Sequence, residues 1–348
     1  MAARFCERFL KIVLVFAIVL AAGAKVGRLN GQTLPDRPSP ATPLPSVKDQ
    51  EPRESACLSF RLELNSKARA ICDQFAEATK KGEWEAAAQT AQKLKTLYSH
   101  NGIGEFCQGY ADLKQGRYIS AVRHFQAAVD RSPDVVLAHL DLGLAFFAIR
   151  QYKLFEEEMF WVVANKPNEA LPYYYLGLYH SGNPGRLDQA VECFQQAVDR
   201  NRNDFQSHYQ LGKLLLAKGD LLGARARFET AEAKASSRGV AFGQALEGLA
   251  EISLRLGDLA AGLRQAQMAV TRDPNSASAR LLLGKLLVQR SETKSGIEEL
   301  RVSALLNPTY AAPHYWLSRA YQQMKLTDAA VHELELFSRL KATYGDDE

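Results

Sequence analysis

Four prolines recur at a fixed interval along the chain. Pro133 and Pro167 are 34 residues apart, as are Pro274 and Pro308, and 107 residues separate the two pairs. The middle gap equals three intervals of 34 plus five residues. Self-similarity at a period of roughly 20 to 50 residues is typical of proteins built from short units that stack on one another. The interval therefore predicts an array of units and not a single closed domain.

Small and large side chains recur with the same period. A glycine stands eight residues into five of the units, alanine or glycine follows about a dozen residues later, and a large residue comes four residues after that. Small residues are needed where two helices cross closely, and a large side chain fills the hole between units. The closing proline ends the second helix before the next unit begins. We therefore expect two helices per unit, with core positions at Phe125, Phe194 and Phe228.

This pattern resembles the tetratricopeptide repeat, an antiparallel helix pair that stacks into a solenoid. The resemblance implies an all-α fold, a right-handed superhelical solenoid of about eight helix pairs over residues 68–344. One residue is inserted in the fourth unit and four before the sixth, which accounts for the five extra residues. The first and last units depart from the pattern, with Phe75 and Ser318 in place of glycine. The expected units are 68–101, 102–135, 136–169, 170–204, 205–238, 243–276, 277–310 and 311–344.

The N-terminus has the pattern of a secretory signal peptide. Three basic residues precede an unbroken apolar run over 12–22, and Ala22-Gly23-Ala24 supplies the small residues that signal peptidase accepts. We expect residues 1–24 to be removed, with an uncleaved N-terminal membrane anchor as the alternative, although the run is short for a spanning helix. In both cases we expect the folded part to be exported, either periplasmic or anchored and facing the periplasm.

A proline-rich segment follows this leader. Six of the 13 prolines stand between residues 25 and 55. Polar, proline-rich sequence takes extended conformations and builds no core. We expect 25–55 to be a disordered spacer, or a stalk if the leader is retained as a membrane tether. A short helical cap is expected over 56–67, directly before the array.

Composition and motifs argue against several functions. Apolar residues make up 47% and charged residues 24%, as in globular proteins. The net charge of +4 comes without a basic stripe interleaved with aromatics, so we expect no nucleic-acid partner. CxxC, HExxH, GxGxxG and P-loop motifs are missing. His139, His208 and His314 stand at the fourth place of their units, where large residues pack, and are too far apart to share a metal. We expect no enzyme activity, no cofactor and no metal.

The resemblance also implies a partner-binding surface. In the family, residues two, five, nine and twelve places into each unit tend to face a concave groove that binds a protein or peptide partner. Here these places are apolar and aromatic in the N-terminal units and charged toward the C-terminus. An apolar stripe of that length usually marks a partner site; the alternatives are interhelix core, and a surface covered by self-association or by the N-terminal segment. The candidate groove residues are Ile103, Phe106, Tyr110, Leu113, Leu137, Leu140, Leu144, Phe147, Leu171, Tyr174, Leu178 and Tyr209.

Three cysteines are candidates for a disulfide bond. Cys72 and Cys107 stand five and six places into adjacent units, on first helices whose axes we expect to be about 8–10 Å apart. Cys57 is the alternative partner for Cys72 and would join the leader to the first unit. Export permits disulfides, but buried free thiols are a further alternative because free cysteine is often buried.

Together these observations predict a non-enzymatic scaffold of the cell envelope that binds a protein partner in its concave groove. The alternative is an accessory subunit that docks an envelope synthase, or a secretion or assembly complex. Both readings rest on the repeat pattern and the export signal, and neither identifies the partner.

Overall fold

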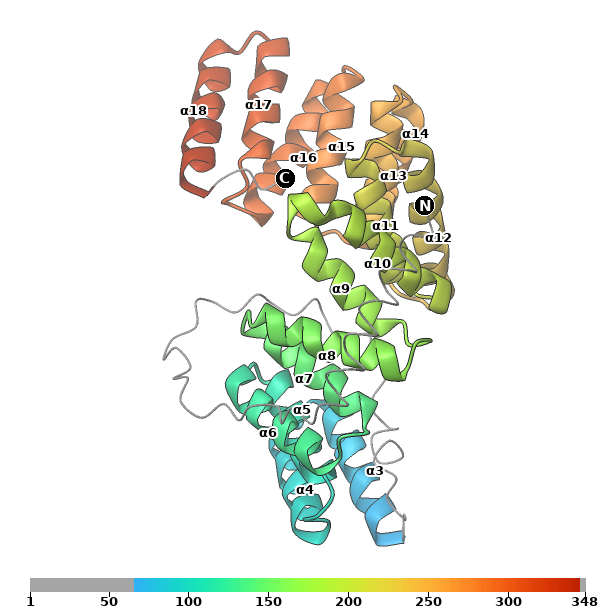
Figure 1. The fold of residues 1–348 in the computed structure, drawn as a ribbon. Helices are drawn as coiled ribbons and strands as arrows, with labels where there is room; N and C mark the ends of the chain where they lie inside the picture. Colours follow the sequence, from blue (N-terminus) through green and yellow to red (C-terminus); the bar gives the residue numbers. More distant parts are fainter. Residues whose placement is uncertain (1–65, 345–348) are drawn as a thin grey trace.

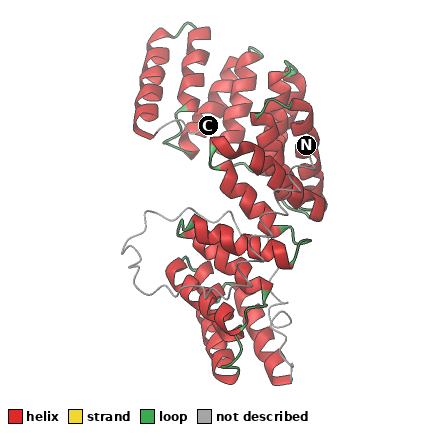
Figure 2. Cartoon of the chain, viewed as in Figure 1, coloured by secondary structure: helices red, strands yellow, loops and turns green. Residues whose placement is uncertain are grey.

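The array is a stack of paired helices. The computed structural model describes residues 66–344, which form sixteen α-helices and one short 3-10 helix and contain no strand. The pairs stand side by side from α3 at one end to α18 at the other (Figure 1), and short loops join the helices (Figure 2). None of the helices in residues 66–344 is both long enough and apolar enough to cross a membrane. The predicted all-α solenoid is confirmed.

Each second helix packs on its own first helix and on the first helix of the next pair. One pair lies in each of the eight expected units, and α3 begins two residues ahead of the first unit. The short helix η2 (Pro184–Arg186) lies in the turn of the fourth pair. The pairs are α3 (Ser66–Lys81) with α4 (Trp84–Leu97), α5 (Ile103–Lys114) with α6 (Tyr118–Arg131), α7 (Val136–Ala148) with α8 (Tyr152–Asn165), α9 (Leu171–Ser181) with α10 (Leu187–Arg200), α11 (Phe205–Ala217) with α12 (Leu221–Ser237), α13 (Gln244–Arg255) with α14 (Leu259–Arg272), α15 (Ala277–Gln289) with α16 (Thr293–Leu306), and α17 (Ala312–Gln323) with α18 (Thr327–Tyr344).

A glycine on the first helix of a pair lets a large ring of the second helix approach. A Cβ added to Gly212 on α11 would lie 2.8 Å from the ring of Phe228 on α12, and one added to Gly248 on α13 would lie 2.5 Å from it. Phe228 is thus held between two successive first helices. Phe125 and Phe194 occupy the same place in their units, and all three rings are at most 1% exposed. The prediction that they are core residues between helix pairs is confirmed.

In the fifth and sixth units the turn between the two helices is set by glycine and aspartate. Gly219 has a φ of +81°, in the left-handed region that favours glycine. Asp220 follows it and accepts a hydrogen bond from the backbone N–H of Gly223 at 2.9 Å, which caps the start of α12. Asp258 caps α14 in the same way through Ala261. These turns reverse the chain within a few residues, so the two helices of a pair lie antiparallel.

In four units a polar pair joins the two helices, and its two residues are always 19 residues apart. The side chain at the fourth place of the unit contacts the side chain at the twenty-third. In the third unit Nδ1 of His139 lies 2.7 Å from Oε2 of Glu158, while Nε2 lies 3.0 Å from the carbonyl oxygen of Pro133 in the preceding unit. The histidine therefore joins two units as well as two helices. The four pairs are Glu105–His124, His139–Glu158, Arg280–Glu299 and His314–Glu333.

The fifth unit has the same two places but no carboxylate. His208 is 4% exposed, and Arg227 occupies the place that glutamate fills in other units. Among the described residues, Nδ1 of His208 has no hydrogen-bond partner, while Nε2 lies 3.3 Å from the carbonyl oxygen of Arg202. Burial is the largest cause that lowers the pKa of His208, and the charge of Arg227 adds to it. His208 is therefore a neutral buried imidazole.

Candidate partner-binding site

The residues two, five, nine and twelve places into each unit form what we call the inner row. In the second and third units this row is closed to solvent at every place but Leu137: Phe106 is 0% exposed, Tyr110 7%, Leu140 3% and Leu144 1%. Ile103, Leu113 and Phe147 are buried as well. These seven side chains are therefore buried in the structure. Their part in partner binding stays a prediction.

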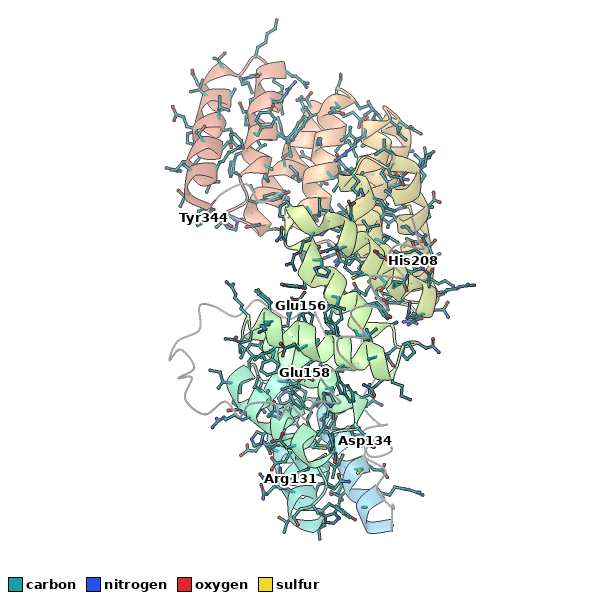
Figure 3. All side chains as sticks on the ribbon, viewed as in Figure 1. Arg131, Asp134, Glu156, Glu158, His208 and Tyr344 are labelled. Atoms are coloured by element: carbon teal, nitrogen blue, oxygen red, sulfur yellow. The ribbon has the colours of Figure 1, made fainter. Side chains whose placement is uncertain are left out.

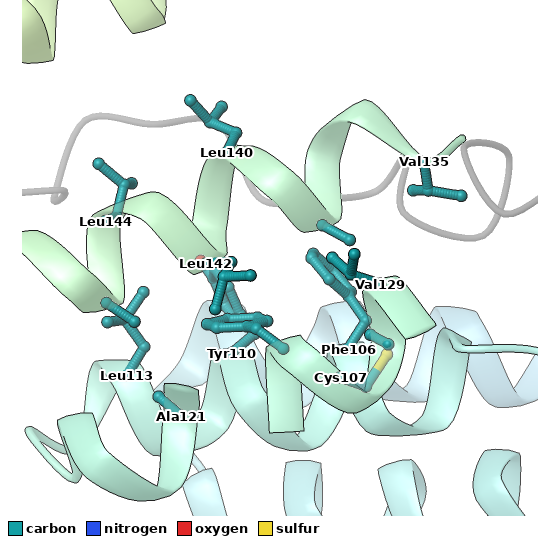
Figure 4. Packing of buried hydrophobic residues seen from close by; sticks show 14 of the residues in the cluster. Phe106, Cys107, Tyr110, Leu113, Ala121, Val129, Val135, Leu140, Leu142 and Leu144 are labelled. Carbon is teal, nitrogen blue, oxygen red and sulfur yellow. The ribbon is translucent and has the colours of Figure 1, made fainter. Parts of the chain in front are cut away.

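Helix α7 is buried on two opposite sides. Leu142 points toward Tyr110 and Leu113, while Leu140 and Leu144 project from the other side of the helix (Figure 4). Every residue from 138 to 148 is buried. The fifth and ninth places of the third unit, Leu140 and Leu144, are thus as dry as the core between helix pairs.

The remaining five candidate residues are partly exposed, namely Leu137, Leu171, Tyr174, Leu178 and Tyr209. Tyr174 on α9 and Tyr209 on α11 hold the fifth place in consecutive units. The ring of Tyr174 packs edge-on against Phe194 at 5.7 Å, and the ring of Tyr209 packs against Phe228 at 5.9 Å. Burial raises the pKa of both tyrosines to about 12, so both are neutral at physiological pH. Each ring rests on a core phenylalanine and keeps part of its surface accessible.

The ninth place of the inner row becomes charged from the fifth unit onward. Lys213 is exposed and lies 5.7 Å from the centre of the Tyr209 ring. Glu251 is paired with Arg255 at 3.1 Å and faces Lys285 at 3.6 Å. In the last unit Arg319 is exposed. In the fifth to eighth units the ninth place is therefore charged and at least partly open to solvent, as the sequence predicts for this half.

A cation also lies against an aromatic ring at the end of the array. Lys285 on α15 and Arg319 on α17 lie 5.4 and 5.7 Å from the ring of Trp316, on two successive first helices. Tyr315, the fifth-place residue of the last unit, packs against Trp316 at 5.7 Å and Phe337 at 5.5 Å. The inner row thus keeps an aromatic member far from the α9–α11 region.

The closed and open parts of the row meet where α8 faces α9. Tyr179 on α9 packs against Tyr152 and Phe155 of α8 at 5.2 and 5.7 Å. Arg186 lies 3.7 Å from Glu156, which is labelled in Figure 3, and its guanidinium donates to the Tyr179 hydroxyl at 3.2 Å. Burial raises the pKa of Glu156, although the charge of Arg186 opposes the rise. An aromatic and ionic contact therefore joins the two halves.

The cysteines correct one prediction. Cys72 is disulfide-bonded, whereas Cys107 and Cys193 are free thiols. The pairing of Cys72 with Cys107 is therefore wrong, and the alternative partner Cys57 lies outside the described residues. One residue of offset along a helix turns a side chain by about 100°, and Cys107 lies beside Phe106 and Val129 (Figure 4). Burial raises the pKa of the Cys107 thiol well above its ordinary value.

The polar pairs show what sequence reasoning missed at the fourth place. The sequence predicts that His139 and His314 pack at the fourth place, and His139 is buried as expected, but each histidine also contacts a glutamate of its own unit, which the sequence analysis does not predict. The sequence contains the pattern that predicts these pairs, because each of the two glutamates stands 19 residues after its histidine. Residues 66–344 contain no group of three or more side chains that could hold a metal ion.

The sequence profile of the tetratricopeptide repeat family matches residues 108–160, 184–239, 209–277 and 247–311. These ranges together take in more than half of the chain and fall within the stacked helix pairs. The chain belongs to the tetratricopeptide repeat family.

Individual relatives are distant. Tetratricopeptide repeat protein 37 of Xenopus laevis is 24% identical over 216 residues, which are 61% of this chain and 14% of the relative, so the chain spans about one seventh of that protein. Among solved structures, a chain of the APC/C hetero-tetramer Cut9–Hcn1 is 17% identical, with a TM-score of 0.59 over 71% of this chain and 48% of that one. YrrB, described as a TPR protein with an unusual peptide-binding site, is 18% identical over 54% of this chain and 95% of its own, with a TM-score of 0.43. The likeness to the Cut9–Hcn1 chain supports the fold alone.

Proposed function

We propose that this chain is a non-enzymatic scaffold that binds a protein or peptide partner along its inner row, with the contact centred on α9 and α11. Tetratricopeptide repeat arrays are in general protein-interaction modules. The observation that carries the proposal is the partly exposed set Tyr174, Leu178 and Tyr209, which stands on consecutive first helices next to the exposed Lys213.

The packing of these rings suits them to binding. Binding energy concentrates in a few aromatic anchors surrounded by contacts that exclude water. Because Tyr174 and Tyr209 already rest on Phe194 and Phe228, little side-chain freedom is lost when a partner covers them. Lys213 beside Tyr209 adds a charge that fixes the register of an extended peptide. A partner segment with apolar residues and an adjacent acidic group fits this arrangement.

We further propose that the scaffold works in the cell envelope after export. The basic residues, the apolar run over 12–22 and Ala22-Gly23-Ala24 support this proposal. N-terminal sequencing of the exported form tests it, with a first residue near Lys25 as the expected result. A retained Met1 or Ala2 would favour the anchored form, and a chain that stays in the cytoplasm would contradict export.

Site-specific photo-crosslinking tests the binding surface. A photoreactive residue in place of Leu178 or Lys213 should capture a partner in cells, whereas one in place of Glu229, exposed on α12, should not. Once the partner is known, Tyr174→Ala and Tyr209→Ala together should weaken binding by about 2 kcal/mol or more. Tyr315→Ala, at the same place in the last unit, is the matched control. Equal capture from all three positions, or loss of binding only with Arg319→Ala, would contradict the proposal.

A further inference from the structure

The last helix of the described stack, α18, exposes a place that every earlier unit encloses. Leu334 stands at the twenty-fourth place of its unit and is 42% exposed. Phe228, at the same place of the fifth unit, is 1% exposed because α11 of its own unit and α13 of the next both lie against its ring. α18 stands at the end of the stack (Figure 1), so no following helix of residues 66–344 covers Leu334. The residues at this place in the first seven units, counted past the insertion in the fourth, are 0 to 1% exposed, namely Ala91, Phe125, Met159, Phe194, Phe228, Ala266 and Leu300.

Val331 on α18 differs from its earlier counterparts in the same way. It is 50% exposed at the twenty-first place, whereas Val122, Leu263 and Ile297 at that place are 7 to 8% exposed. The end unit of a repeat array normally has a polar outer face. α18 instead presents two large aliphatic side chains to solvent, three residues apart on one side of the helix. This surface is suited to contact with another protein molecule.

We propose that this outer side of α18 is the interface of a homodimer. The α18 helices of two copies pack antiparallel about a two-fold axis that passes level with residues 336 and 337. The inference goes beyond the partner binding proposed above and does not depend on it, because α9 and α11 belong to other units.

A further repeat fits this end of the array less well than a second α18 does. The twenty-seventh place is 0% exposed in each of the first seven units, and five of them hold alanine or serine there, with Leu94 and Val162 in the other two. Phe337 holds the place in the last unit, and its ring packs against Tyr315 at 5.5 Å. This ring occupies space that a following first helix would need, whereas the exposed side of α18 stays open.

The exposed side of α18 has the spacing of a helix–helix seam. Val331, Leu334, Ser338 and Ala342 follow one another at intervals of three and four residues, and all four are exposed. The first two side chains are large and the last two are small. About the proposed axis, Val331 lies opposite Ala342 of the second copy, and Leu334 lies beside Ser338 of the second copy. Each large side chain therefore meets a small one, which lets the two helices approach closely.

The charges on α18 are complementary to themselves when the two helices are antiparallel. Glu335 and Arg339 are exposed on one flank of the seam, one helical turn apart. The proposed axis brings Glu335 of each copy to Arg339 of the other, whereas a parallel pair would set like charges side by side. The first turn of α18 is acidic at Asp328 and its last turn is basic at Lys341. An antiparallel pair places the acidic start of one helix beside the basic end of the other.

A closed pair with two binding surfaces is the consequence. A two-fold interface uses the same surface of both copies, so assembly stops at two chains. The dimer then presents the α9–α11 surface twice. A partner with two binding segments would gain affinity from this arrangement without any new contact.

Sedimentation equilibrium of the full chain tests the dimer. The mass should fall from that of two chains to that of one on dilution through the micromolar range. Val331→Glu together with Leu334→Glu should raise the dissociation constant of the dimer at least about tenfold, because unpaired carboxylates would enter an apolar contact. Leu222→Glu, on a leucine of α12 that is 78% exposed, is the matched control and should dimerise like the parent chain. Circular dichroism should show that all three chains are folded.

Cysteine cross-linking tests the orientation of the two helices. Val331→Cys and Ala342→Cys are eleven residues apart, about 16 Å along the helix, which is too far for a disulfide within one copy. The chain that carries both substitutions should form a covalent dimer on mild oxidation. Each single variant should form no more of it than the parent chain, because the antiparallel arrangement separates identical positions.

Four results would overturn the proposal. A parent chain that stays monomeric throughout the concentration range has no such interface. Association that the double glutamate variant leaves unchanged would belong to another surface of the chain. A mass that grows beyond two chains would indicate head-to-tail stacking, and covalent dimers of the single cysteine variants would indicate parallel helices. None of these results bears on photo-crosslinking at Leu178, so the dimer can fail while the binding function stands.

Discussion

The second and fifth units have the same kinds of residue at their core positions, and they differ on the inner row. Both place a phenylalanine, Phe125 or Phe228, at most 1% exposed against a glycine of the first helix. Their inner rows differ: Tyr110 is buried, while Lys213 at the same place is exposed. The contacts that build the solenoid are therefore separate from the places that determine what its inner side can bind. The residues of the inner row can therefore vary between units while the core contacts between helices stay the same.

Removal of a phenylalanine from the shared register should have the largest effect and should be alike in both halves. Phe125→Ala and Phe228→Ala each remove a buried ring that lies against a glycine, and each should lower the free energy of unfolding by about 3–5 kcal/mol. Chemical denaturation measures the change, and Leu222→Ala, exposed on α12 at 78%, is the control with little effect. A decrease in the free energy of unfolding of less than about 1 kcal/mol for either variant would contradict the assignment of Phe125 and Phe228 to the core between helix pairs.

The inner row should respond differently in the two halves. Leu144→Ala removes a side chain that is 1% exposed and should cost about 2–5 kcal/mol in the full chain. Lys213→Ala at the same place of the fifth unit should change stability by no more than about 0.5 kcal/mol. Urea melts of the two variants make the comparison directly. Similar costs at both places would remove the distinction between a closed and an open row.

The charged pair between the helices of a unit should contribute less. Glu158→Ala leaves Nδ1 of the buried His139 without its carboxylate at 2.7 Å, which should cost about 1–3 kcal/mol. Glu157→Ala next to it removes an exposed carboxylate and serves as the control. If both variants have the melting temperature of the parent chain, the His139–Glu158 pair contributes nothing to joining α7 and α8.

The fifth unit should show the smallest effect, and only as a pH dependence. Because burial lowers the pKa of His208 below 6.5 in the folded chain, the unfolded chain takes up the proton first as the pH falls. The stability from neutral His208 is thus present above about pH 6.5 and is lost below it. His208→Gln should reduce the drop in melting temperature between about pH 7.5 and 5.5, whereas the exposed His332→Gln should leave it unchanged. An unchanged drop in His208→Gln would show that this imidazole does not contribute to it.

The core positions between helices could be predicted from the sequence because each of them accepts only one kind of residue. Only glycine at Gly212 leaves room for Phe228, so the pattern repeats and can be counted. The inner row has no such constraint. Phe106 and Tyr110 are equally suited to a partner groove and to a dry core, and only the contacts around the helix decide between them.

Two further features could have been predicted from the sequence. The 19-residue spacing of His139–Glu158 and His314–Glu333 repeats across units, but each histidine read singly looks like a packing residue. The wrong pairing of Cys72 with Cys107 came from treating places five and six as equivalent. A helix turns by about 100° between them, so the two thiols face different sides. Comparison between units, place by place, would have found both.

Side-chain footprinting of the unmodified full chain tests the central claim, that one inner row is closed at its N-terminal end and open at its C-terminal end. Hydroxyl radicals oxidise accessible aromatic rings, and mass spectrometry measures the rate at each residue. The account predicts that Tyr209 and Tyr315 are oxidised several-fold faster than Tyr110 and Phe147 in the same sample. Equal rates for the four rings, or faster oxidation of Tyr110, would contradict it.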